Sequence, residues 1–364
     1  MSRERAETSV PDIPRLRDIV ISAADLLMRH NWKVWFWGDS IGFEGLLDVA
    51  EWLSLPQYEA FVYGMMKAWG ARHVPPRALD YTAPGLALLR LWERTGDAVL
   101  LTLARKHAEY LAAFRRTDRG AYVRFEDPQF DQAPELPEGS GETASIATTA
   151  GGPCIFVDNM HFDGPFFAKL YQLTGEHRYR ELAVGNILPS IELLWDEQHH
   201  LFHHFWSERL KRRNEVFWGR GQGWAMLGIT HVLEYLPQED PAWSRLLEVY
   251  RKHCRAMAAA QDPSGHWHTV ITDPSSYLET SVAAFMVAGL SRGLRHGWIE
   301  LSYRHLIDRA FSALLASVTP EGKLDGVSYE TYPSLSAKHY RNMPQGAIVP
   351  WGQGPLLAAI RSSA

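Results

Sequence analysis

Trp218-Gly219-Arg220-Gly221-Gln222-Gly223-Trp224 places three glycines, two tryptophans, an arginine and an amide in seven consecutive residues. The glycines let other groups approach the backbone closely. The tryptophans offer flat apolar faces with a polar N–H edge, and the arginine offers a planar fork that fits a carboxylate. An apolar helical run follows at 225–233, so we expect a loop that opens a helix. The combination fits a wall for a sugar acid; the alternative is a tight turn whose tryptophans fill a core and whose arginine is solvated.

Helical periodicity extends over most of the chain. In the first helix, apolar residues such as Leu16, Val20, Ala23 and Leu27 fall on one face. Further helices are expected at 42–54, 57–70, 84–95, 98–116, 161–173, 178–194, 222–235, 241–260, 279–294, 300–317 and 351–361. Strand signals are few and short, at 121–125, 201–206 and 266–270. The pattern predicts an all-α protein.

The helices are joined in pairs by a recurring turn. Leu91-Trp-Glu-Arg-Thr-Gly-Asp97 and Tyr171-Gln-Leu-Thr-Gly-Glu176 each end an apolar helix at Thr-Gly, with glycine in the place of a left-handed C-cap. An acidic residue then starts the next helix, where it suits the helix dipole. Six helices begin with small or helix-breaking residues: Gly42, Pro84-Gly85, Gly164-Pro165, Gly221-Gly223, Ser281 and Gly354-Pro355. Six such starts and six partner helices predict an (α/α)6 barrel of six hairpins, with helix N-termini that attract anions gathered at one end.

The domain organisation follows from the same pattern. We expect one barrel domain over residues 1–364, with a flexible N-terminal segment at 1–14. Residues 126–153 are rich in proline, glycine, serine, threonine and acids and have no helical period. A loop of this length is usually functional or disordered. It is interpreted as a rim or lid of the site, with a surface insertion as the alternative.

Composition excludes several classes of protein. The chain has 364 residues, of which 46% are hydrophobic, and a net charge of −5, which gives no support for nucleic-acid binding. Mean hydropathy is −0.23 and no run of 18 apolar residues occurs, so no membrane span is expected. The first residues carry charges of both signs and do not resemble a signal peptide. Cys154 and Cys254 are too few for a disulfide framework. We therefore expect a soluble, cytoplasmic protein with reduced thiols, without membrane or nucleic-acid partners.

Two aspartates are candidates for acid–base chemistry. Asp158 follows an apolar run in Cys154-Ile-Phe-Val-Asp-Asn-Met160 and is expected to be partly buried. A buried carboxyl group keeps its proton to higher pH and can serve as a general acid. Asp80, in Arg77-Ala-Leu-Asp-Tyr-Thr-Ala-Pro-Gly85, also precedes a helix. For both, the alternative is a helix N-cap, which the local pattern of Asp158 favours.

The histidines of Leu201-Phe-His-His-Phe-Trp206 suggest a metal site at first sight. No cluster with ligand spacing supports it, however, and a catalytic zinc needs three well-placed ligands. Neither a metal nor a cofactor is expected. Alternation on a strand would let one of His203 and His204 face a cavity while the other is solvated. Glu279, in Tyr277-Leu-Glu-Thr-Ser281, is interpreted as a first-turn acid rather than an acceptor for a sugar hydroxyl.

At this point the chain resembles a family. The motifs Asp80-Tyr-Thr-Ala-Pro-Gly85, Phe156-Val-Asp158, Trp218-Gly-Arg-Gly-Gln-Gly-Trp224 and Tyr277-Leu-Glu-Thr-Ser281 occur in the order found in unsaturated glucuronyl and rhamnogalacturonyl hydrolases. These are glycoside hydrolase families 105 and 88, of which 105 is the better fit. The resemblance runs from about residue 35 to the C-terminus. It implies an (α/α)6 barrel and a terminal 4,5-unsaturated uronic acid on a lyase-generated oligosaccharide as substrate.

The resemblance also implies roles for individual residues. Asp158 would be the general acid/base and Asp80 its partner carboxylate. Arg220, His204 and the tryptophans Trp218 and Trp224 would line the sugar site. Gln222 would line it too, although the family usually has asparagine there, and the longer amide is expected to shift substrate preference.

The chemistry would be hydration of an enol ether. A carboxyl group protonates C4, water adds at C5, and the resulting hemiketal opens and releases the aglycone. Arg220 and helix N-termini would balance the substrate carboxylate. Two alternatives remain: a glycosidase or sugar epimerase acting on saturated sugars, and a non-catalytic helical-repeat binding protein. The sequence leaves open the preferred uronate, the linkage, any sulfation and the oligomeric state.

Overall fold

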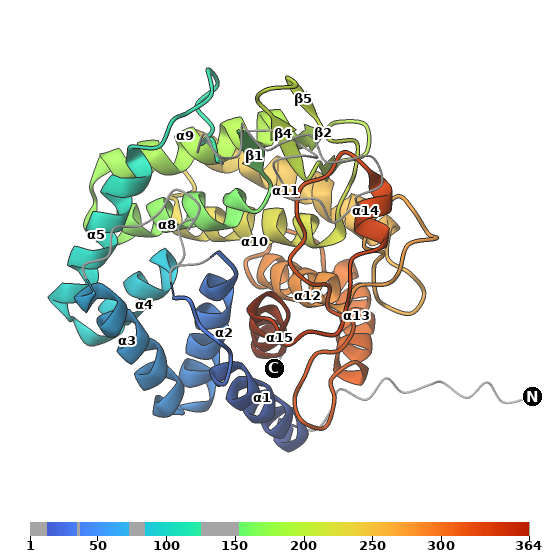
Figure 1. Ribbon diagram of the computed structural model, residues 1–364, viewed down its shortest axis with the longest axis horizontal. Helices are drawn as coiled ribbons and strands as arrows, with labels where there is room; N and C mark the ends of the chain where they lie inside the picture. The colour runs from blue at the N-terminus through green and yellow to red at the C-terminus, as the bar shows by residue number, and fades with distance from the viewer. Residues whose placement is uncertain (1–12, 35–36, 73–83, 125–152, 364) are drawn as a thin grey trace, which may run out of the picture.

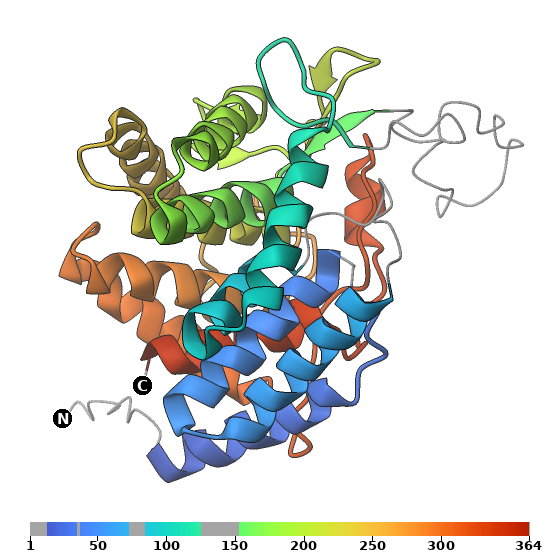
Figure 2. The same ribbon diagram turned by 90° about the vertical axis from the view of Figure 1, so that its left-hand side faces the viewer.

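Alternating helices of the chain form an inner and an outer ring (Figures 1 and 2). The computed structural model describes residues 13–34, 37–72, 84–124 and 153–363. The inner helices are α2 (Trp37–Leu53), α4 (Gly85–Thr95), α8 (Asn159–Thr174), α10 (Gly219–Tyr235), α12 (Thr280–Arg295) and α15 (Pro350–Ser363). The outer helices are α1 (Ile13–Met28), α3 (Pro56–Ala71), α5 (Ala98–Ala112), α9 (His177–Leu194), α11 (Pro241–Ala259) and α13 (Arg304–Ala316).

The inner ring is closed by the last helix. Each inner helix packs on the next, and α15 packs on both α12 and α2. Glycines make the closing contact tight: a Cβ on Gly354 would lie 2.2 Å from the carbonyl oxygen of Ile41, and a Cβ on Gly45 would lie 2.8 Å from the carbonyl oxygen of Gly354. The six inner and six outer helices of the described residues confirm the predicted (α/α)6 barrel.

The predicted hairpin turns are present. Gly96 and Gly175 end α4 and α8 in the left-handed conformation, with φ of 68° and 72°. Asp97 then caps α5, because its Oδ1 accepts a hydrogen bond of 2.9 Å from the N–H of Val99. Each turn reverses the chain, so all inner helices run in one direction and their N-termini meet at one end of the barrel.

The stretch 218–224 is not a loop. Trp218 is the N-cap and α10 begins at Gly219, so the glycines lie inside the first helical turns. They are required by close packing: a Cβ on Gly219 would lie 2.7 Å from the carbonyl oxygen of His268, and one on Gly223 would lie 2.5 Å from the ring of Phe285. The expected loop was wrong because the glycines serve helix contacts rather than a turn.

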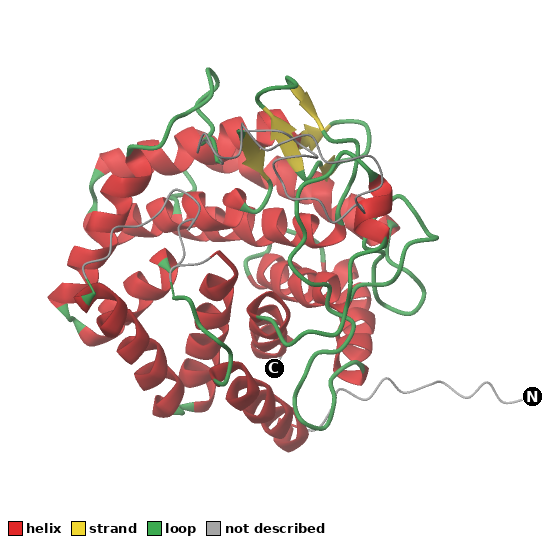
Figure 3. Ribbon diagram, in the orientation of Figure 1, coloured by secondary structure: helices red, strands yellow, loops and turns green. Residues whose placement is uncertain are grey.

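Short strands gather at one side of the barrel (Figure 3). Strands β1 (Cys154–Phe156), β4 (Phe205–Ser207) and β5 (Arg212–Arg213) form an antiparallel sheet in the order β1-β4-β5, with Ile155 opposite Trp206. Strands β2 (Trp195–Asp196) and β3 (Leu201–Phe202) form a two-stranded ribbon. The remaining short elements are the 3-10 helix η1 (Leu301–Tyr303) and helix α14 (Ala337–Arg341). In the expected strands at 121–125 and 266–270, the described residues make isolated bridges instead.

Some predictions concern residues that lie outside the described ranges. They are most of the N-terminal segment 1–14, Asp80, and all of the long segment 126–153 except Pro153. In the part of the chain that the structure covers, no helix has the length and apolar character needed to cross a membrane. Cys154 and Cys254 are buried and carry free thiols.

Candidate functional site

Asp158 lies between strand β1 and helix α8. Its backbone is already helical, with φ −57° and ψ −35°, and its side chain makes no capping hydrogen bond. Asp158 thus occupies the N-cap position of α8, as the local pattern favoured, but its side chain does not perform the capping role. The carboxyl group is 15% exposed and lies at the end of the barrel where the inner helices begin.

Burial controls the protonation of this carboxyl group. It raises the pKa of Asp158 to about 7, although a backbone hydrogen bond and the positive charge of Arg220 act in the opposite direction. Such a group keeps its proton up to neutral pH. It can therefore donate that proton to a substrate and recover one from water.

His204 lies beside Asp158. The distance from its Nε2 to Asp158 Oδ2 is 3.6 Å, and its ring centre is 4.4 Å from that of Trp218. The imidazole is 2% exposed. Burial lowers the pKa of His204 well below its usual value, and the charges of His339 and Arg220 lower it further. The ring is therefore neutral at physiological pH.

The hydroxyl of Tyr340 fixes which nitrogen of His204 carries the proton. This hydroxyl accepts hydrogen bonds of 3.2 Å from Asn214 Nδ2 and from the N–H of Ser334. Its own hydrogen is then donated to His204 Nδ1 at 2.7 Å, rather than to the Ser334 carbonyl at 3.3 Å. Assigned from this network, His204 has its proton on Nε2, and that N–H faces Asp158.

The neighbouring histidines have other partners. His203 Nε2 is 3.3 Å from Asp196 Oδ2, and His199 Nδ1 is 2.9 Å from Asp196 Oδ1. The expected strand 201–206 is interrupted at His203 and His204, because β3 pairs with β2 whereas β4 pairs with β1 and β5. His204 thus faces Asp158, while His203 is 7% exposed and not solvated as alternation would allow.

Arg220 forms a fully buried ion pair with Glu279. The two side chains are 0% exposed, and Nη1 is 2.6 Å from Glu279 Oε1. The same carboxylate oxygen accepts hydrogen bonds from the hydroxyls of Ser281 at 2.6 Å and Ser328 at 2.8 Å. Glu279, which was expected to be a simple first-turn acid, is the anion that balances Arg220.

The guanidinium of Arg220 also holds a loop in place. Nη2 donates hydrogen bonds of 2.9 Å to the carbonyl of Tyr329 and to the hydroxyl of Thr331. Its carbon lies 4.7 Å from the ring centre of Trp218 and 5.9 Å from that of Trp351. The visible partners of Arg220 are thus protein groups, and its pairing with a substrate carboxylate stays a prediction.

Gln222 joins helix α10 to strand β3. Its Oε1 accepts a hydrogen bond of 2.9 Å from the N–H of Phe202, and its Nε2 donates one of 2.7 Å to the Phe202 carbonyl. The amide is 0% exposed. The amide therefore pairs with the backbone of β3 as a neighbouring strand would. This pairing holds in place the segment that carries His204.

Tryptophans at the starts of three inner helices, α2, α10 and α15, meet at this end of the barrel. Trp37 stacks on Trp351 with ring centres 4.8 Å apart and meets the edge of Trp224 at 6.4 Å. Trp218 and Trp224 are 1% and 0% exposed, and the described residues provide no hydrogen-bond partner for either indole N–H. In this structure the two motif tryptophans lie buried behind the site and do not form its open surface.

The sequence did not reveal two members of this site, Ser328 and Tyr340, and it gave Glu279 a different role. Glu279 and Ser328 complete the Arg220 cluster, and Tyr340 orients His204. Ser328 and Tyr340 stand more than a hundred residues after their partners in segments without a helical or motif signal.

Known proteins resemble this chain over nearly its full length. It is 26% identical over 344 residues to the unsaturated rhamnogalacturonyl hydrolase YesR of Bacillus subtilis (strain 168), with 92% of each chain covered. A possible member of the GH105 family from Salmonella enterica serovar Paratyphi A superposes with a TM-score of 0.85 at 21% identity, covering 99% of this chain and 96% of that one. The unsaturated glucuronyl hydrolase of Bacillus sp. GL1 superposes with a TM-score of 0.69 at 21% identity, covering 94% of each chain. The two structural likenesses show the shared fold.

The family assignment rests on the sequence. The model of Glycosyl Hydrolase Family 88 matches residues 18–363, a span that starts within α1 and ends at the last residue of α15. It includes every described residue of the site around Asp158, His204 and Arg220. The chain therefore belongs to glycosyl hydrolase family 88.

Proposed function

We propose that this protein removes a terminal 4,5-unsaturated uronic acid from oligosaccharides that polysaccharide lyases produce. The proposal is supported by the family, by the activity named for the Bacillus subtilis relative, and by a general acid of suitable pKa at the N-terminal end of the inner helices. Substrate is the only partner that it requires.

Asp158 is the proton donor in this proposal. Its protonated carboxyl group delivers the proton to C4 of the enol ether, and positive charge develops at C5 and the ring oxygen. Water adds at C5 as the Asp158 carboxylate takes up one of its protons. The resulting hemiketal opens and the aglycone leaves without attack at the anomeric carbon. The distance between two carboxylates that separates retaining from inverting glycosidases has no bearing on this route.

His204 assists by stabilising the anionic form of Asp158. Burial makes that anion unfavourable, so a fixed dipole close to it lowers the barrier to proton transfer. The Nε2–H of His204 supplies this dipole from 3.6 Å, which is longer than a hydrogen bond and leaves room for closer approach as the charge develops. Tyr340 keeps the imidazole in the required tautomer.

The other predicted site residues complete the proposal. Asp80 is the partner carboxylate, on the strength of its motif. Trp218, Trp224 and Gln222 shape the sugar site, and their burial supports an action through the residues in front of them. Arg220 contributes positive potential for the substrate carboxylate together with the helix N-termini.

The proposal includes a single catalytic domain over residues 1–364. The closure of the ring by α15 against α2 supports it, since the inner ring needs helices from both ends of the described chain. A cytoplasmic location is also proposed, and the two free thiols of Cys154 and Cys254 support it.

The observation that carries the proposal is the largely buried Asp158 carboxyl group, 3.6 Å from Nε2 of a His204 that Tyr340 holds in place. The test follows the ultraviolet absorbance of the conjugated double bond in unsaturated disaccharides from pectin, ulvan and glycosaminoglycans. We expect wild-type protein to remove the absorbance of at least one substrate and Asp158→Asn to leave all of them unchanged. Unaltered absorbance with wild-type protein on every substrate, together with cleavage of saturated aryl glycosides, would instead establish an ordinary glycosidase.

A further inference from the structure

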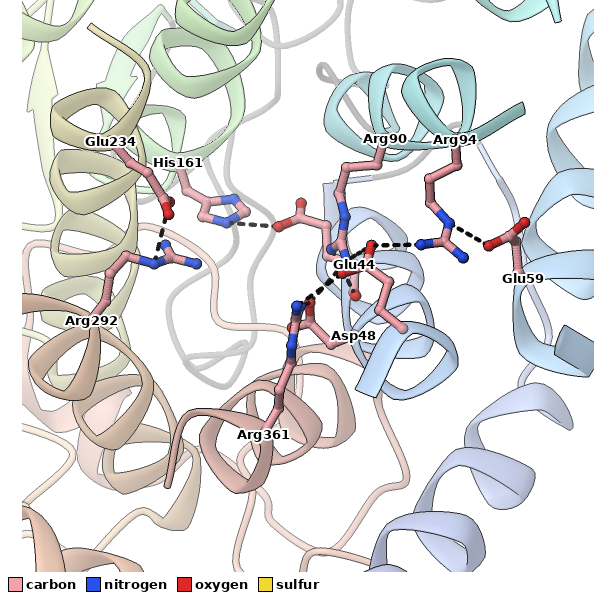
Figure 4. Close-up of polar contacts among 10 residues, drawn as sticks. Glu44, Asp48, Glu59, Arg90, Arg94, His161, Glu234, Arg292 and Arg361 are labelled. Carbon is pink, nitrogen blue, oxygen red and sulfur yellow. Dashed lines mark hydrogen bonds and ion pairs between the residues drawn. The ribbon is translucent and has the colours of Figure 1, made fainter. Parts of the chain in front are cut away.

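A second cluster of ionisable side chains lies inside the barrel, apart from Asp158. Glu44 of α2, His161 of α8 and His231 of α10 each offer one ligand atom, and these atoms lie within 4.8 Å of one another. Within the described ranges it is the only group of three such side chains with this spacing. The side chains belong to residues that are 8%, 1% and 6% exposed. Figure 4 shows the imidazole of His161 directed at the carboxylate of Glu44.

The hydrogen bonds of this cluster are incomplete. Neither ring nitrogen of His161 has a hydrogen-bond partner among the described residues, and neither does Nδ1 of His231. His161 Nε2 is 3.5 Å from Glu44 Oε2, which is a long ion-pair contact. Buried polar atoms without partners destabilise the folded state and call for an explanation.

Among the described charged groups around the cluster, only a histidine lies within ion-pair distance of the Glu44 carboxylate. A cavity of about 260 Å³ borders Glu44 and His231 and is lined by six basic residues: Arg90, Arg94, Lys169, Arg292, Arg295 and Arg361. Even so, no lysine or arginine of the described chain lies within ion-pair distance of the Glu44 carboxylate; its one such partner there is His161.

Five of these six basic side chains, all except Arg295, form ion pairs with other acidic residues of the described chain. Arg90 binds Asp48 at 2.9 Å and Glu51 at 2.8 Å, and Arg361 binds the same two carboxylates (Figure 4). Arg292 lies 3.5 Å from Glu234. With these cations neutralised locally, the Glu44 carboxylate is available to a positive ion.

We propose that Glu44, His161 and His231 form a binding site for a divalent transition-metal ion, with Zn²⁺ as the best match. Two imidazoles and a carboxylate are an established ligand set for zinc, and they leave a fourth position for water. Ligand atoms around tetrahedral zinc at about 2.0–2.1 Å lie roughly 3.3 Å apart. Ligand atoms up to 4.8 Å apart therefore have to move together by up to about 1.5 Å when the ion binds.

One further feature fits a metal. The cavity is bordered by the partly exposed side chains of Arg94 and Arg361, which are 40% and 37% exposed, so an ion has a path from solvent. A bound ion would link three inner helices, and His161 is three residues after Asp158 on α8.

The first experiment measures metal content. Wild-type protein is stripped with a chelator, incubated with Zn²⁺, passed through a desalting column and analysed for bound zinc. We expect about one ion per chain and, in Glu44→Gln and His231→Gln, at least a tenfold weaker affinity. His199→Gln is the matched control, because His199 is 43% exposed and contacts Asp196 instead. Retained zinc in the cluster variants, or its loss in the control alone, would overturn the assignment.

A second experiment does not depend on variants that fold. Crystals of wild-type protein soaked in Zn²⁺ are measured at the zinc absorption edge. An anomalous peak between the three ligand atoms supports the site. A density map without a peak there, from crystals in which zinc is bound elsewhere or not at all, shows that Glu44 and His161 form a metal-free ion pair.

Discussion

Replacing Glu279 with glutamine tests the buried ion pair beneath the proposed sugar site. Glutamine has nearly the same shape, and its oxygen can still accept from Arg220, Ser281 and Ser328, which now lie 2.6, 2.6 and 2.8 Å from Glu279 Oε1. The substitution therefore removes mainly the negative charge. Because Arg220 is 0% exposed, its positive charge is left without a balancing anion in a region that water does not reach.

The expected loss of unfolding free energy is large for so small a change in the side chain. Removing one partner of a buried ion pair costs about 3–5 kcal/mol of unfolding free energy. At about 2 °C per kcal/mol, the lower end for long chains, the melting temperature should fall by about 6–10 °C. The assay is thermal unfolding followed by circular dichroism. Glu248→Gln is the control: Glu248 is 67% exposed and pairs with Lys252 at 3.1 Å, so its loss should cost about 0–1 kcal/mol.

The double variant Arg220→Met/Glu279→Met separates charge from packing. Methionine can fill the space between the rings of Trp218 and Trp351. If an uncompensated charge causes the loss in Glu279→Gln, the double variant should be less destabilised than the two single methionine variants added together. A melting temperature of Glu279→Gln within about 2 °C of wild type, or strictly additive effects in the cycle, would refute the reasoning.

Further predictions concern the acid, its orienting partner and the helix packing. With the pKa of Asp158 raised to about 7, initial rates should fall as pH rises through that value. The folded state holds the Asp158 proton more tightly than the unfolded state. The stability that this proton adds is therefore complete below pH about 4 and is lost as the pH rises to about 7. At pH 8, Asp158→Asn should melt at or above the wild-type temperature and should lack turnover. A lower melting temperature there would contradict the sign. Tyr340→Phe should lower kcat roughly tenfold with KM little changed, since His204 loses the bond that fixes its tautomer; a change confined to KM would place Tyr340 in substrate binding. Gly228→Ala should destabilise by about 1–3 kcal/mol, because its Cβ would lie 2.2 Å from the carbonyl oxygen of Met160, and an unaltered denaturation midpoint would show that α8 and α10 can separate.

The helices could be predicted from the sequence because each has a local signature. The apolar stripe of α11 and the Thr-Gly ends of α4 and α8 lie within the element that they define, so the expected 241–260 helix differs from Pro241–Ala259 by one residue. The expected start of α2 was Gly42, but the helix begins five residues earlier, at Trp37. Gly42 does not mark a helix end. It is a glycine because a side chain there would collide with Trp32.

The site could be predicted only in part. Asp158 and His204 were identified by resemblance, and the structure brings them to within 3.6 Å. The tautomer of His204 depends on Tyr340, whose contact with His204 spans 136 positions of sequence, and no local pattern encodes such a pairing. The partner of Arg220 was missed for the same reason, since Glu279 reads locally as an ordinary helix-start acid.

The closure of the ring by α15 has a consequence for synthesis. Helices α1 and α2 leave the ribosome well before α15, yet Asp48 pairs with Arg361 across 313 positions and Gln353 reaches the carbonyl of Ala23 across 330. The nascent chain must therefore keep the apolar flank of α2 uncovered until α15 has been synthesised. Folding of this enzyme should be governed by one late, long-range docking event, and chaperones that shield the unfinished ring would raise its yield in the cell.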